Sequence, residues 1–217
     1  MHTADRLARA IAYVVNPLVL PPLLFASVLA LYDAPPAEIG LVAGIAAMFF
    51  TGLPLALLFV LLRTGRAASI ELFDRKARRL PYAVGFAGTL AAFFVVDMTV
   101  QTARPIVLAL AGLLCGGTAL MAIINLRWKI SLHAASITGF VTMLLYAASR
   151  TVPPPSSVVP AAGLAATGLA AAGLVGAVMW ARLRSNAHTP GEVWAGMVFG
   201  LAVPFIVLLA LEATGRL

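Results

Sequence analysis

Charged side chains are scarce in this 217-residue chain: 11% of its residues are charged, whereas 62% are hydrophobic. The mean hydropathy is +1.00. A water-soluble domain needs far more polar surface to cover its core, so the composition excludes that class. One membrane-spanning helix takes about 20 mostly apolar residues, so the length allows six or seven spans and no separate soluble domain. We therefore treat residues 1–217 as a single transmembrane domain.

Other absences exclude several kinds of chemistry. The single cysteine, Cys115, lies in an apolar run, so there is no disulfide framework. The eight acidic residues are too few for a multi-carboxylate magnesium site, and the aspartate-rich clusters of membrane prenyltransferases are missing. The chain also has no GxxxxGK[ST] loop, no paired CxxC and no HExxH. We expect neither a metal nor a cofactor.

Seven apolar runs follow one another, at about 10–31, 38–62, 81–98, 105–126, 131–149, 157–180 and 191–212. Continuous runs without polar alternation predict helices rather than a β-barrel. The third and fifth runs are short, which favours six spans over seven. The first run contains Asn16 and Pro17 and is too long for a signal peptide, so we expect a retained, kinked span. The predicted fold class is an all-α, polytopic transmembrane helix bundle.

The positive charges predict the orientation of this bundle. With the N-terminus in the cytoplasm, the cytoplasmic segments hold Arg6, Arg9, Arg63, Arg66, Arg75, Lys76, Arg78, Arg79, Arg127, Lys129, Arg182 and Arg184. The opposite side holds only Arg104, Arg150 and Arg216. This imbalance predicts a cytoplasmic N-terminus. It also assigns the net charge of +7 to loops that face anionic lipid, so we expect no nucleic-acid partner.

Small residues crowd the last two runs. The sixth contains Gly163, Gly168, Gly173 and Gly176, and in the seventh Gly196 and Gly200 lie four residues apart. Such spacing lets helix backbones approach each other closely.

Three predicted cytoplasmic segments, 74–81, 127–133 and 181–192, contain two of the three histidines, His133 and His188. Orientation requires positive charge, which a neutral imidazole hardly supplies, so histidines among arginines favour a site. Arginine forks match phosphate oxygens, and histidine can attack phosphorus or protonate a leaving oxygen. Glu192 follows His188 by one helical turn and can orient its ring.

A structural explanation stands beside this one. Thr189-Pro190-Gly191-Glu192 matches a helix start, with threonine as the cap, proline at the first position and glutamate closing a capping box. This explains Glu192 without catalysis, although both roles can coexist. The basic residues Arg127, Lys129 and Arg184 fit orienting charges.

Residues 181–192 resemble the third motif of the type 2 phosphatidic acid phosphatase superfamily, which includes the vanadium haloperoxidases. That motif is Ser-Arg, five residues, His, three residues, Asp. Arg182, His188 and Glu192 keep the spacing, with alanine in place of serine and glutamate in place of aspartate. Ser131 and His133 are similar to the family's Pro-Ser-Gly-His element. Lys76 and Arg79 are the nearest match to its first motif, and the resemblance covers about residues 70–210.

The resemblance implies a metal-independent phosphohydrolase for a lipid phosphate or an isoprenyl diphosphate. His188 would be the nucleophile that forms a phosphohistidine, Glu192 would orient it, and His133 would protonate the leaving oxygen. The phosphate oxygens would be held by Arg182, Ser131, Lys76 and Arg79. The expected location is the cytoplasmic face of a bacterial inner membrane.

A second interpretation stays open. Leu132 replaces the family's glycine, Glu192 replaces its aspartate, and the first motif is incomplete. These departures fit a non-catalytic relative that binds anionic lipid or transports a small molecule.

Overall fold

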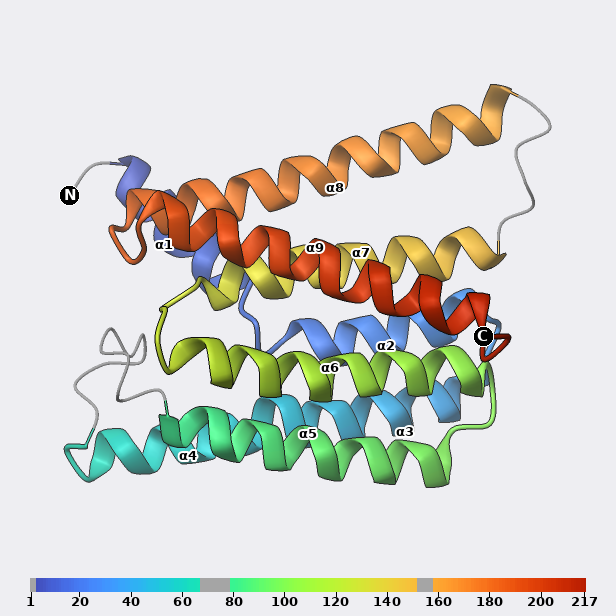
Figure 1. Ribbon diagram of the computed structural model, residues 1–217, viewed down its shortest axis with the longest axis horizontal. Helices are drawn as coiled ribbons and strands as arrows, with labels where there is room; N and C mark the ends of the chain where they lie inside the picture. The colour runs from blue at the N-terminus through green and yellow to red at the C-terminus, as the bar shows by residue number, and fades with distance from the viewer. Residues whose placement is uncertain (1–2, 67–78, 152–157) are drawn as a thin grey trace.

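The computed structural model describes residues 3–66, 79–151 and 158–217, and every regular element in these ranges is a helix (Figure 1). In chain order they are α1 (Thr3–Val14), α2 (Leu20–Leu31), α3 (Pro36–Ala46), the π-helical η1 (Ala47–Gly52), α4 (Leu53–Arg63), α5 (Arg79–Thr99), α6 (Arg104–Asn125), α7 (Leu132–Thr151), α8 (Val158–Arg184) and α9 (Pro190–Ala213). Six stretches are long and apolar enough to cross a membrane: Pro36–Arg63, Arg79–Thr99, Arg104–Asn125, Leu132–Thr151, Ala166–Arg184 and Pro190–Ala213. The prediction of an all-α, polytopic bundle is confirmed.

The first apolar run forms two helices, α1 and α2, rather than one continuous kinked helix, and the break lies at Asn16 and Pro17. A residue before proline is pushed out of the helical region, and Asn16 precedes Pro17. The Asn16 side-chain oxygen accepts a hydrogen bond from the Leu18 backbone N–H at 3.0 Å, which closes a local turn between α1 and α2. With 12 residues, α2 is about 18 Å long, too short to cross a bilayer alone. It is nevertheless a core helix, with Phe25 and Val28 fully buried.

The backbones of α7 and α9 approach each other closely through glycines, as the spacing of Gly196 and Gly200 predicts. A Cβ atom on Gly200 would lie 2.2 Å from the Ala135 carbonyl oxygen and 2.8 Å from the Gly139 nitrogen. A Cβ atom on Gly196 would lie 2.5 Å from the Ser131 carbonyl oxygen. Only hydrogen fits at these two positions, so the glycines set how α9 is seated on α7.

The glycines of α8 behave differently. A Cβ atom on Gly168, Gly173 or Gly176 would meet nothing within 4 Å. In Figure 1, α8 diverges from the rest of the bundle towards its N-terminal end. The close helix approach that these glycines predict is therefore absent within the described chain.

The loops that carry the candidate residues lie at one end of the bundle. The α6–α7 loop, the α8–α9 loop and the start of α5 all meet the left-hand end in Figure 1, where α1 also lies. Tyr82, in the first turn of α5, packs with Leu132 and Ala195 against Ile130 and Ala135. The helix termini thus bring the α6–α7 loop, the α8–α9 loop and the start of α5 to the same end, as the alternation of spans predicts.

We predict that Gly200→Ala lowers the free energy of unfolding by about 1–3 kcal/mol, because the added methyl group forces α7 and α9 apart. Gly116→Ala is the matched control, since a Cβ atom there meets nothing within 4 Å. Thermal unfolding of the detergent-solubilised protein measures both. Equal midpoints for the two variants would contradict the close α7–α9 contact.

Candidate functional site

A tight connection between α8 and α9 positions the predicted third motif. The Ala187 backbone N–H donates to the Arg182 carbonyl at 3.3 Å, and Asn186 has a positive φ of 51°, which ends α8. Two residues later α9 begins with the predicted capping box. The Thr189 hydroxyl accepts from the Glu192 N–H at 3.4 Å, and the Glu192 carboxylate accepts from the Thr189 N–H at 3.1 Å. His188 is therefore held between the end of one helix and the start of the next.

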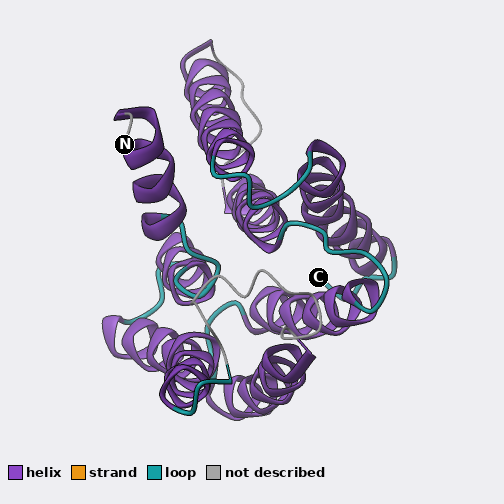
Figure 2. Cartoon of the chain, turned by 90° about the vertical axis from the view of Figure 1, so that its left-hand side faces the viewer, coloured by secondary structure: helices purple, strands orange, loops and turns teal. Residues whose placement is uncertain are grey.

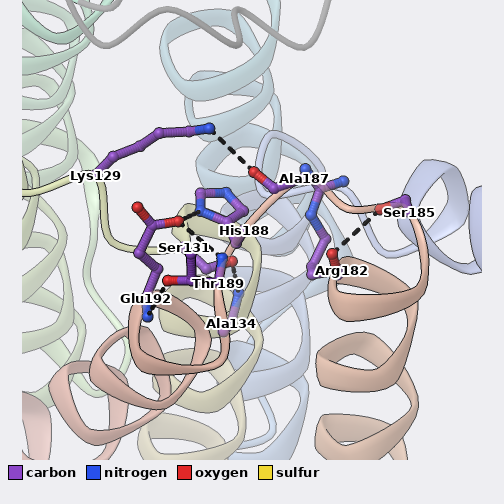
Figure 3. Close-up of polar contacts among 9 residues, drawn as sticks. All are labelled: Lys129, Ser131, Ala134, Arg182, Ser185, Ala187, His188, Thr189 and Glu192. Carbon is purple, nitrogen blue, oxygen red and sulfur yellow. Dashed lines mark hydrogen bonds and ion pairs between the residues drawn. The ribbon is translucent and has the colours of Figure 1, made fainter.

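The same carboxylate contacts the candidate nucleophile. His188 Nδ1 lies 3.0 Å from Glu192 Oε2, the oxygen that also accepts from Thr189 (Figure 3). The His188 side chain is 2% exposed and that of Glu192 is 17% exposed. Because a carboxylate can only accept, Nδ1 carries the hydrogen, and the neutral ring has its lone pair on Nε2. Capping and histidine orientation are thus combined in one side chain.

The second segment docks directly onto this loop. The Ser131 N–H donates to the Glu192 carbonyl at 2.9 Å, and the Lys129 ammonium donates to the Ala187 carbonyl at 3.0 Å. Ser131 is fully buried, and its hydroxyl accepts from the Ala134 N–H at 3.4 Å, so it caps α7. Two of the three predicted segments are therefore bonded to each other.

The interpretation of Lys129 as an orienting charge missed this contact. Its side chain bridges two loops that lie 58 residues apart in sequence. The sequence feature that could have indicated this contact is the position of Lys129 in the segment that also carries Ser131 and His133.

His133 is directed to another partner. Its Nε2 atom lies 3.2 Å from the Ala12 carbonyl oxygen in the last turn of α1. Since a carbonyl only accepts, Nε2 carries a hydrogen there. The last carbonyls of a helix lack partners inside the helix, so the histidine caps α1. Sequence reasoning missed this contact because the spacing of residues says nothing of where α1 docks.

The predicted phosphate-binding residues differ in how close they lie to His188 and Glu192. Arg182 is 2% exposed, and in Figure 3 its guanidinium lies beside the α8–α9 loop near Ala187. Arg79 is exposed at the start of α5, and no hydrogen bond or ion pair joins it to either described loop. Lys76 lies outside the described residues. Of the four predicted phosphate ligands, Arg182 lies in the segment that carries the histidine–glutamate pair, and Ser131 lies in the segment that is hydrogen-bonded to it.

The arrangement combines a held imidazole with nearby positive charge. Lys129 and Arg182 belong to the segments around His188, and the N-terminus of α9 adds the positive end of a helix dipole. Within residues 3–66, 79–151 and 158–217, no three His, Cys, Asp or Glu side chains group as a metal site. The chemistry that such a set can perform is binding an anion and transferring a group to nitrogen.

Compared with known proteins, the chain matches no family model, no curated protein and no solved structure. The resemblance to the phosphatase superfamily therefore rests on the residue pattern.

We predict that Thr189→Ala lowers the free energy of unfolding by about 1 kcal/mol, because an N-cap acceptor is lost. Glu192→Gln is predicted to change it by less than about 0.5 kcal/mol, since glutamine also closes a capping box. The midpoints of thermal unfolding in detergent are measured for both variants and for the parent protein. A larger loss for Glu192→Gln than for Thr189→Ala would show that the negative charge on Glu192, rather than its capping bond, stabilises the fold.

Proposed function

We propose that this chain is an integral membrane phosphohydrolase that cleaves a lipid phosphate or an isoprenyl diphosphate. The observation that supports the proposal most is the part-buried His188–Glu192 pair, joined at 3.0 Å and bonded through its backbone to Ser131. A histidine held at Nδ1 by a carboxylate is arranged to use Nε2 as a nucleophile. The excess of basic residues at this end favours a cytoplasmic location, in an inner membrane if the chain is bacterial.

The proposed reaction has two steps. The Nε2 lone pair of His188 attacks phosphorus, and the bond from phosphorus to the lipid oxygen breaks as the phosphorus–nitrogen bond forms. The leaving oxygen, which belongs to the lipid alcohol or, for a diphosphate, to the lipid monophosphate, takes a proton from His133. A water molecule then attacks the phosphohistidine, gives its proton to His133 and releases phosphate, which restores both histidines.

The contact of His133 with α1 determines which ring nitrogen of His133 can donate the proton to the leaving oxygen. Nε2 faces the Ala12 carbonyl at 3.2 Å, so the transferable proton must be on Nδ1. The ring then acts as an acid only in its doubly protonated form, in which Nε2 still donates to the Ala12 carbonyl. In this proposal α1 orients the acid much as Glu192 orients the nucleophile.

Charge compensation is assigned to the basic groups around the loop. A phosphate approaching His188 meets the N-terminus of α9, with Arg182 and Lys129 on the adjacent segments. Glu192 offsets the positive charge that develops on His188 as it bonds to phosphorus. Lys76 and Arg79, from the first segment (residues 74–81), complete the proposed set.

A specific observation favours a second candidate function. Arg182 is 2% exposed and Ser131 is fully buried, so neither presents much surface to a ligand. A non-catalytic relative that binds anionic lipid would tolerate such burial. It would bind lipid phosphate without releasing phosphate, which separates the two candidates.

We predict that His188→Ala abolishes phosphate release, with at least about a 10³-fold loss of kcat, because no other group can form the covalent intermediate. The assay is phosphate release in detergent from phosphatidic acid, phosphatidylglycerol phosphate and undecaprenyl diphosphate. His2→Ala is the matched control and should keep the parent activity. Equal activity of the His188→Ala variant and the parent would exclude the proposed nucleophile.

We further predict that Glu192→Gln lowers kcat by about 10²–10⁴-fold while the protein stays folded, because a neutral amide no longer stabilises the charged histidine. Phosphate release and thermal unfolding are measured on the same preparation. Full activity in this variant would show that Glu192 caps α9 and has no part in catalysis.

A further inference from the structure

The first helix has one face fixed to the bundle. Ala8 and Ala12 are 1% and 8% exposed where α1 packs on α8. Asp5 pairs with Arg184 at the end of α8 at 3.0 Å, and the Ala12 carbonyl contacts His133 of α7. These contacts define which side of α1 faces outward.

The outward face of α1 is both apolar and basic. Leu7, Tyr13 and Val14 are 54%, 80% and 73% exposed, and Arg6 and Arg9 are exposed as well. At 100° per residue, Leu7 and Val14 share one side of this face, and the two arginines with Tyr13 form the adjacent edge. Asp5 is the only acidic residue of α1, and Arg184 neutralises it, so the outward face is positive.

α1 lies at the edge of the bundle, beside a candidate membrane span. Viewed along the bundle in Figure 2, the helix lies at the periphery and is seen from the side, whereas most of the other helices are seen nearly end-on. Its neighbour α8 is a candidate membrane span whose Leu174 and Trp180 are each 39% exposed. A helix that crosses the end of a span bundle, with an apolar side and a basic edge, has the form of an interfacial helix.

We propose that the outward face of α1 binds the anionic phospholipid surface of the membrane. Leu7 and Val14 enter the acyl boundary, and Arg6 and Arg9 contact the phosphates of acidic head groups. Charge complementarity favours this occupant over a second copy of the chain, because two positive faces repel each other. The proposal concerns a surface apart from the His188 pair and does not depend on phosphatase activity.

The test uses a fluorescent label on Tyr13→Cys of the full chain, in a Cys115→Ser background, reconstituted with brominated lipids. Each arginine near an anionic surface contributes about 1 kcal/mol, or about five-fold in affinity. We therefore expect brominated phosphatidylglycerol to bind beside the label at least five-fold more strongly than brominated phosphatidylcholine. Adding Arg6→Gln and Arg9→Gln should bring this ratio close to one.

Met98→Cys is the matched control, because Met98 is 79% exposed in the last turn of α5 at the opposite end. Its label should be quenched equally by both lipids. Equal quenching at position 13, or a preference that survives both arginine substitutions, would overturn the proposal. A Tyr13→Cys label that neither lipid quenches would also overturn it, and an efficient cross-link between two copies would assign the face to a dimer instead.

Discussion

The seating of α9 on α7 is the constraint on which the rest of the site depends. Gly196 and Gly200 let α9 approach so closely that the Ser131 N–H reaches the Glu192 carbonyl at 2.9 Å. This bond joins the N-cap of α7, the helix that carries His133, to the first turn of α9, which follows His188. Without that contact, the α6–α7 and α8–α9 loops would still lie at the same end of the bundle, but Ser131 and Glu192 would not be joined. Packing inside the membrane-spanning region thus determines polar geometry at its boundary.

Glu192 illustrates how one side chain can satisfy folding and chemistry together. Its Oε2 atom accepts from the Thr189 N–H and contacts His188 Nδ1, so the start of α9 and the orientation of the ring are coupled. A glutamate at the third helical position is already favoured by capping and by the helix dipole. The histidine gains its partner at little additional cost in stability. The capping and catalytic explanations of this motif are therefore compatible.

The sequence was sufficient for the helical class, the six long spans and the capping box, because each follows from local composition or spacing. It also placed Gly196 and Gly200 in a helix contact. The break at Asn16 and Pro17 has a local cause, yet the length of the apolar run concealed it. The contacts of Lys129 with Ala187 and of His133 with Ala12 could not be predicted, since both depend on how separate helices dock. The open glycines of α8 show that close spacing of small residues permits contact but does not identify the partner.

The most direct test of the central claim is to look for the covalent intermediate itself. Stoichiometric protein and lipid phosphate are mixed, quenched within milliseconds under alkaline conditions that preserve phosphohistidine, and analysed by peptide mass spectrometry. The phosphohydrolase proposal predicts phosphate on the peptide that carries His188, formed before free phosphate appears. Phosphate release with no adduct, phosphate on a different residue, or lipid binding without either would contradict it.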